Sequence, residues 1–196
     1  GYCELPELMS WNTATLAKNE ATLERDIGSC SRGIDKHCRR HFWQTASLPR
    51  LFAPDNPDEF DFGAFNDLHQ LNALATDTAG DGTFETTWLA GDYELMPFNQ
   101  LAAPEQRPYE SIRQTGTRPF PYLVQGGTGR AARVQITGLW GWAAIPEAIT
   151  QAALMQAARI FKRKDSPEGV AGWGAFGDIR VGRTDPDVVG MLEDYR

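Results

Sequence analysis

Two histidines and a cysteine near position 40 are the residues best suited to metal chemistry. His37 and His41 are four residues apart, a spacing that places two imidazoles on one helix face, and Cys38 lies between them. Imidazole and thiolate are the usual zinc ligands of proteins. Arg39 and Arg40 also separate the histidines, however, and no nearby carboxylate completes a ligand set. A metal-binding domain is therefore an alternative, and we favour reduced core cysteines beside surface histidines.

An acidic turn further along the chain matches part of a calcium-binding loop. Asp77, Asp81 and Glu85 stand at the first, fifth and ninth positions of such a loop. Ala79 replaces the ligand at the third position, and Trp88 stands where a bidentate glutamate is needed. The flanking residues have the composition of strands and not of helices. The sequence therefore predicts the turn of a β-hairpin here.

No group of residues has the pattern of an enzyme active site. The chain has three histidines, no nucleophile elbow and no zinc signature. The glycine-rich stretch at residues 125–129 lacks the Lys-Ser/Thr that follows a phosphate-binding loop, so we do not expect nucleotide binding. We therefore expect no enzymatic activity and no cofactor.

The net charge of −7 is unevenly distributed. Residues 51–106 contain no Lys or Arg and eleven acids, namely Asp55, Asp58, Glu59, Asp61, Asp67, Asp77, Asp81, Glu85, Asp92, Glu94 and Glu105. Phosphate contacts need cations, so this segment is not expected to bind nucleic acid tightly. The acids suit either a surface that repels DNA or a solvated face that keeps the protein soluble. A nucleic-acid-binding module is the alternative function, and it would use Arg32, Lys36, Arg39 and Arg40.

Apolar periodicity predicts helices at residues 5–10, 13–42 and 145–164. The middle helix carries an apolar seam with spacings of seven, four, three, four and four residues, formed by Leu16, Leu23, Ile27, Cys30, Ile34 and Cys38. Cys30 and Cys38 would be about 12 Å apart along such a helix, too far for a disulfide. Together with Cys3 they form no disulfide framework, which favours folding in a reducing compartment.

Residues 134–164 are the segment around which the chain is organised. A short strand leads to a Trp140-Gly141-Trp142 corner, and Pro146 stands at the first position of the following helix. The apolar face of this helix is wider than the roughly 100° that a surface helix needs. We therefore predict that it packs against its own domain and against a neighbouring subunit, through Ile149, Ala153, Leu154, Ala157 and Phe161.

The remaining segments complete a fold that we predict to be mainly α with a small β element (α+β). Residues 43–138 form a β and loop insertion with an edge strand at Pro49, a hairpin and a short strand at residues 93–96. Residues 1–164 form the core, and residues 165–196 form a C-terminal arm that is too apolar for a disordered tail. No apolar run reaches 18 residues, so no membrane span is expected.

Several stretches together resemble the head-to-tail connector (adaptor) proteins of long-tailed bacteriophages. The match is carried by the opening Gly1-Tyr2-Cys3-Glu4-Leu5-Pro6-Glu7-Leu8, the helix ending Arg39-Arg40-His41-Phe42-Trp43, and the hairpin region with Gly91-Asp92-Tyr93-Glu94-Leu95. The most specific stretches are Gly138-Leu139-Trp140-Gly141-Trp142, Gly172-Trp173-Gly174-Ala175-Phe176-Gly177 and Asp185-Pro186-Asp187. The resemblance covers most of the chain, except residues 97–129.

This resemblance implies a structural virion protein of the phage neck, assembled in the host cytoplasm. The expected partners are the portal protein, identical subunits in a ring, usually of twelve, a tail-side stopper or tail-completion protein, and genomic DNA that passes through the channel without sequence-specific contact. The arm is expected to dock on the portal or a neighbouring subunit through Trp173, Phe176, Ile179, Val181, Val188, Leu192 and Tyr195. We also predict that acids of the hairpin, Asp77, Asp81 and Glu85, face the channel.

Overall fold

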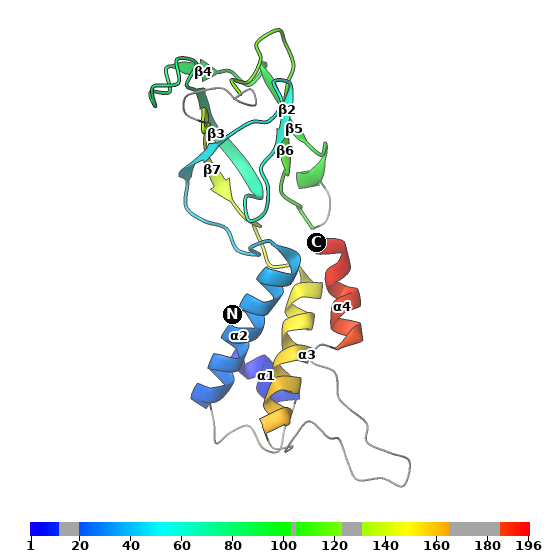
Figure 1. The fold of residues 1–196 in the computed structure, drawn as a ribbon. Coiled ribbons are helices and arrows are strands. Elements are labelled where there is room, and N and C mark those ends of the chain that lie inside the picture. The colour runs from blue at the N-terminus through cyan, green and yellow to red at the C-terminus, as the bar shows by residue number, and fades with distance from the viewer. Residues whose placement is uncertain (12–19, 103–104, 123–130, 165–184) are drawn as a thin grey trace. The chain divides into compact units, whose positions relative to one another are not determined.

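The computed structural model describes residues 1–11, 20–102, 105–122, 131–164 and 185–196 (Figure 1). The chain divides into two compact units. Unit 1 consists of Gly1–Arg39 and Ile145–Arg196, and unit 2 consists of Arg40–Ala144. The described part of unit 1 is helical, and unit 2 contains the strands.

Unit 1 is built from α1 (Leu5–Trp11), α2 (Glu20–Cys38), α3 (Glu147–Lys164) and α4 (Pro186–Leu192), followed by the 3-10 turn η4 (Glu193–Tyr195). The helices pack because each presents an apolar stripe to the others. The apolar seam that the sequence predicts in α2 is confirmed for its described members, all buried, which are Leu23, Ile27, Cys30, Ile34 and Cys38. Leu16 lies outside the described residues.

The three cysteines of unit 1 are buried and form no disulfide within the described chain. Burial raises the pKa of the Cys3 thiol to about 11 and that of Cys30 to about 12. Both groups are therefore protonated thiols at neutral pH and poor nucleophiles.

Helix α4 is fixed to α3 at its start. Asp185 caps α4 by accepting a hydrogen bond from the backbone N–H of Asp187 at 3.1 Å, and Pro186 follows the cap. Arg159 of α3 forms an ion pair with the same Asp185 carboxylate. Val188 and Leu192 on the inner side of α4 are buried. The end of the described chain is thus held by both an ion pair and apolar packing.

Unit 2 contains two antiparallel sheets. The first has the strand order β1-β7-β3-β4 and consists of β1 (Leu48–Phe52), β3 (Leu68–Thr76), β4 (Thr86–Trp88) and β7 (Val134–Trp140). Strand β7 is central, and its residues alternate between buried and half-buried, as expected for a strand with one face on a core.

The second sheet has the order β2-β6-β5. Its strands are β2 (Glu59–Asp61), β5 (Tyr93–Met96) and β6 (Ser111–Gln114), and the short 3-10 helix η2 (Gln100–Ala102) follows β5. Strand β2 and strand β5 are the two edges of this sheet, because among the described residues each pairs with β6 alone.

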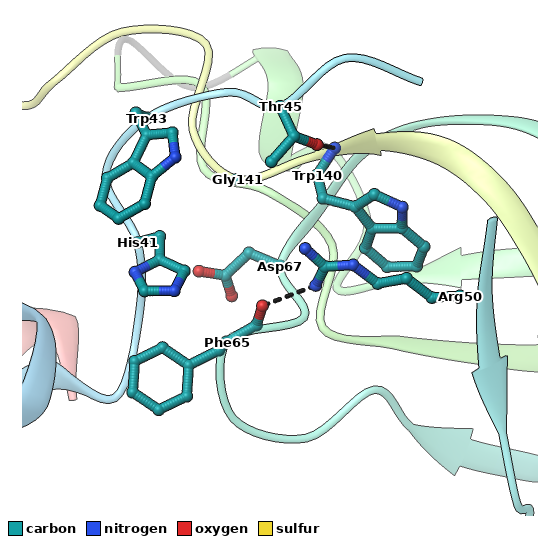
Figure 2. Close-up of a pocket in the computed structure, with 8 residues that line it drawn as sticks. All are labelled: His41, Trp43, Thr45, Arg50, Phe65, Asp67, Trp140 and Gly141. Carbon is teal, nitrogen blue, oxygen red and sulfur yellow. Dashed lines mark hydrogen bonds between the residues drawn. The ribbon is translucent and has the colours of Figure 1, made fainter. Parts of the chain in front are cut away.

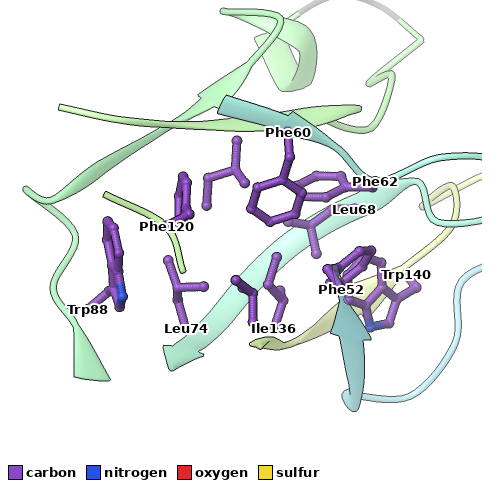
Figure 3. Packing of buried hydrophobic residues seen from close by; sticks show 11 residues of the cluster. Phe52, Phe60, Phe62, Leu68, Leu74, Trp88, Phe120, Ile136 and Trp140 are labelled. Atoms are coloured by element: carbon purple, nitrogen blue, oxygen red, sulfur yellow. The ribbon is translucent and has the colours of Figure 1, made fainter. Parts of the chain in front are cut away.

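Side chains from both sheets form one hydrophobic core in unit 2 (Figure 3). It contains Phe52, Phe60, Phe62, Leu68, Leu74, Trp88, Ile112, Phe120, Val134, Ile136 and Trp140. The ring centroids of Trp88 and Phe120 lie 4.5 Å apart in a stacked arrangement, and Phe60 meets Phe120 edge-on at 5.0 Å. Such aromatic pairs stabilise the core beyond their apolar area.

The prediction of a mainly α fold is wrong. The described chain has seven strands in two antiparallel sheets, so the class is α+β with substantial sheet. The error arises because long amphipathic helices give a strong periodic signal, whereas strands of three to five residues give almost none. Within the residues that the structure describes, no helix is long and apolar enough to cross a membrane.

Most individual elements were predicted correctly. The helices at residues 5–10 and 145–164, the hairpin of β3 and β4, the strand at residues 93–96 and the edge strand at Pro49 are confirmed. The helix predicted at residues 13–42 ends four residues earlier, at Cys38, where Arg39 adopts a positive φ of 57°. Residues 13–19 of that prediction lie outside the described residues.

Candidate functional site

The carboxylate of Asp67 in unit 2 belongs to a residue that is 6% exposed, and it contacts polar groups from other segments of the chain. Arg40 donates from Nη1 to Asp67 Oδ1 at 2.5 Å, and Arg40 Nη2 donates to Glu110. Trp142 donates from its indole N–H to Asp67 Oδ2 at 3.2 Å. We call Arg40, Asp67, Glu110 and Trp142 the Asp67 cluster. It joins residues from four separate segments of the chain.

Backbone contacts strengthen the same region. The N–H of Gly141 donates to the carbonyl of Asp67 at 2.7 Å. Gly141 has a positive φ of 92°, and a Cβ at this position would lie 1.9 Å from the carbonyl oxygen of Trp43. Only glycine fits such a close approach. The Trp-Gly-Trp corner singled out in the sequence therefore owes its glycine to the neighbouring Trp43 backbone.

A small aromatic pocket lies beside the Asp67 cluster (Figure 2). The ring of His41 lies 4.2 Å from that of Trp43 and 4.8 Å from that of Phe65. Arg50 stacks 4.5 Å from the ring of Trp140 and donates to the carbonyl of Phe65 at 2.7 Å. The cavity measures about 10 Å³, which is the space of a single water molecule. It is too small for an organic substrate.

The electrostatics of Asp67 reflect its burial. Desolvation raises the pKa of this carboxyl to about 6, although the charge of Arg40 and the Trp142 hydrogen bond act to lower it. Both carboxylate oxygens are engaged by the protein itself. The group is therefore a structural anchor. It binds the two segments by which the chain enters and leaves unit 2, at Arg40 and at Trp142.

The hairpin acids occupy a tight, internally bonded turn. Asp77 is fully buried, and its carboxylate accepts hydrogen bonds from the backbone N–H groups of Gly80, Asp81 and Gly82. Glu85 accepts from the backbone N–H of Thr78 at 2.9 Å. Carboxylate oxygens of Asp77, Asp81 and Glu85 lie within 4.8 Å of one another. Only Asp81 and Glu85 of the three present charge at the surface, and their position along a channel stays a prediction.

The residues predicted to pack in a ring are buried within the single chain. Ile149, Ala153 and Ala157 of α3 are fully buried, and Leu154 and Phe161 are each 6% exposed. Of the predicted arm contacts, Val188, Leu192 and Tyr195 are buried as well. Their contacts with other subunits stay predictions. Trp173, Phe176, Ile179 and Val181 lie outside the described residues.

Several residues that the alternative functions would use form ion pairs or ring contacts within the chain. Arg32 forms an ion pair with Asp35 at 2.8 Å, and Arg40 belongs to the Asp67 cluster. Cys38 is 1% exposed, and His41 stacks against aromatic rings.

Neither a family model nor a curated protein matches the sequence. Among the solved structures that share the fold is the neck of an empty gene transfer agent (GTA) particle computed with C6 symmetry. A chain of that structure matches with a TM-score of 0.55 and 20% identity, covering 97% of this chain and 87% of that one. The protein therefore shares the fold of a chain in that neck.

The second match is the neck of a native GTA particle computed with C12 symmetry, with a TM-score of 0.50, 21% identity and coverage of 90% of this chain and 82% of that chain. At the level of fold, the resemblance to head-to-tail neck proteins that the sequence indicated is confirmed. Because both identities are low, the likeness speaks for the fold alone.

Sequence reasoning missed the Asp67 cluster. Arg40, Asp67, Glu110 and Trp142 span about half the chain and form no local motif. The one signal was the tryptophan-rich corner around Gly141, whose glycine and indole both contact Asp67.

Proposed function

We propose that this chain is a structural protein of the neck of a phage or phage-like particle. It forms a ring, of twelve copies, beneath the portal protein, extends the DNA channel and joins the capsid vertex to tail-side stopper or tail-completion proteins. It is not an enzyme in this proposal. The observation that carries the proposal is a fold shared over most of the chain with a chain of a neck that has C12 symmetry.

The architecture supports such a structural role. The Asp67 cluster and the aromatic pocket are filled by the protein's own side chains, and the pocket holds no more than about one water molecule. Interactions of this kind stabilise a fixed arrangement of the backbone and do not bind a substrate. A ring through which DNA moves needs rigid subunits with few cations on the surface beside the DNA, because cations would retain the phosphates.

The acidic block of unit 2 fits this requirement. Residues 51–106 contain eleven acids and no Lys or Arg. In the proposed ring, Asp81 and Glu85 at the hairpin tip face the channel or its exit and keep the DNA from adhering. The hairpin holds them in place through the buried Asp77.

The proposal is tested by assembling particles without this chain. We expect capsids that package DNA but do not join tails, because the ring between portal and tail is missing. Electron microscopy counts tailed and tailless capsids, and complementation by the wild-type chain restores the tailed form. Normal numbers of tailed, infectious particles in its absence would refute the proposal.

A further inference from the structure

The outer edge of β2 offers backbone groups that pair with nothing in the described chain. Strand β2 is an edge of its sheet, and its partner is β6. Gln114 donates to the carbonyl of Asp58, and Phe62 donates to the carbonyl of Glu110, both at 2.8 Å. Hydrogen-bonded residues alternate along an antiparallel pair. The N–H and C=O groups of Glu59 and Asp61 therefore point away from β6, towards the open edge.

An open groove runs along this edge. It is lined by Ala53, Asp55, Asn56, Glu59, Phe60 and Asp61, and its volume is about 540 Å³. The side chain of Phe60 points inward and is 4% exposed, whereas Asp55 and Asp61 are exposed. The groove thus combines an unpaired strand edge with an acidic rim.

The described part of the chain compensates the acidic rim only in part, through the charge of Arg113 near Glu59. Asp55 and Asp61 have no ion pair among the described residues, and Glu59 accepts a hydrogen bond from Ser111 at 3.1 Å. Arg113 stands opposite Glu59 in the sheet, but its guanidinium pairs with Glu94 at 2.8 Å. An extended segment that fits this edge must therefore carry positive charge.

One stretch of the chain combines a strand-like pattern with positive charge. The sequence Ile179-Arg180-Val181-Gly182-Arg183 alternates apolar and basic or small residues at its start, as a strand does. It belongs to the twenty residues between Lys164 at the end of α3 and Asp185 at the cap of α4. Residues 179–183 lie two to six residues before Asp185, so they can extend about 7 to 20 Å from the start of α4, at roughly 3.3 Å per extended residue.

We propose that residues 179–183 of a second copy add to the free edge of β2 as an extended segment. This inference rests on the proposed ring, in which the edge of one copy and the arm of the next meet at every interface. Arg180 then lies on the outer face beside Glu59 and Asp61, at the distance of a cross-strand pair. Ile179 and Val181 face the inner side, next to Phe60. Main-chain hydrogen bonds provide the affinity, and the charges select the partner.

A peptide titration tests the edge directly. A fluorescent peptide of residues 176–184 is added to the full chain carrying Arg180→Glu, which weakens competition by the chain's own segment, and its anisotropy is recorded. We expect saturable binding that weakens about tenfold when Glu59→Lys and Asp61→Lys are added. The matched control, Asp81→Lys with Glu105→Lys, makes the same change in charge away from the groove and leaves binding unchanged.

A charge-swapped peptide shows whether the lysine-substituted receptor loses binding because of its changed charges or because of a folding defect. A receptor with Glu59→Lys and Asp61→Lys that keeps its natural Arg180, so that its own segment does not compete, should bind a peptide with Arg180→Glu more tightly than the natural peptide. No saturable binding, or equal binding by the acidic and the lysine-substituted grooves, overturns the inference. Neither result bears on whether the chain resides in the neck, which the particle assembly experiment decides.

Cysteine cross-linking tests whether the segment comes from a second copy. The chain with Asp61→Cys and Arg180→Cys is oxidised within assembled particles. The three native thiols are buried and do not compete. We expect a ladder of covalent dimers and higher oligomers that depends on both substitutions. A cross-link confined to the single chain, or no cross-link, contradicts the proposal.

Discussion

At the scale of single residues, Asp67 connects the two segments by which the chain enters and leaves unit 2. Its carboxylate accepts hydrogen bonds from the side chains of Arg40 and Trp142, and its backbone carbonyl accepts one from the N–H of Gly141. A buried charge is costly unless it is paired and hydrogen-bonded, and here the pairing only partly offsets the desolvation. Two substitutions separate the contributions of charge and of pairing.

Asp67→Asn should change how stability depends on pH. The folded pKa of Asp67 is about 6, above the ordinary value of 3.8, so between these values the folded chain holds a proton that the unfolded chain has lost. The stability that wild type has relative to Asp67→Asn should therefore fall by about 2 kcal/mol as pH rises from 4 to 6, and stay level above 7. Denaturant titrations of both proteins at each pH measure the difference. A constant difference would show that the pKa is not raised.

Arg40→Met should destabilise the protein because it leaves the Asp67 carboxylate buried without its cation. We expect a loss of about 3 kcal/mol in the free energy of unfolding at pH 7. Arg113→Met is the matched control, since it removes an ion pair with Glu94 whose side chains are 44% and 40% exposed, and it should cost much less than Arg40→Met. Equal losses would contradict a structural role specific to the Asp67 cluster.

At the scale of elements, unit 2 depends on short strands whose pairing is fixed by turns and by core aromatic residues. The hairpin of β3 and β4 places Thr76 opposite Thr86, and the buried Asp77 closes the turn between them. The turn is thus held by its own carboxylate. This explains why an incomplete calcium-loop pattern occurs in a hairpin.

Asp77→Ala should unfold the hairpin tip and destabilise unit 2 by about 2 kcal/mol, because three backbone N–H groups lose their acceptor. Asp81→Ala removes an exposed carboxylate that accepts one bond, from Thr83, and should change stability by roughly 0.5 kcal/mol or less. Thermal unfolding and amide exchange at Thr76 and Thr86 distinguish the two variants. Similar behaviour would mean that the Asp77 bonds do not stabilise the turn.

The elements differ in how far they could be predicted. Helix α3 and the hairpin carry strong local signals, a proline at the helix start in one and an Asp-Gly turn in the other. Strand β6 was missed because Ser111–Gln114 contains one apolar residue, Ile112, and is a strand only through its partners β2 and β5. The Asp67 cluster was missed for the same reason, since its members meet only after both sheets have formed.

At the scale of the whole molecule, the two units contribute different features to the proposed neck subunit. Unit 1 buries the apolar faces of its helices, including the residues predicted for ring packing, within the single chain. Unit 2 carries the acidic block and, at β2, an open strand edge. Contacts between subunits are therefore also expected at strand edges and charged surfaces, in addition to those predicted for α3.

Cryo-electron microscopy of purified necks tests the central claim most directly. We predict twelve copies of this chain in one ring between the capsid vertex and the tail, with Asp81 and Glu85 towards the channel or its exit. Density for the chain elsewhere in the particle, its absence from the neck, or these acids on the outer rim would contradict the account.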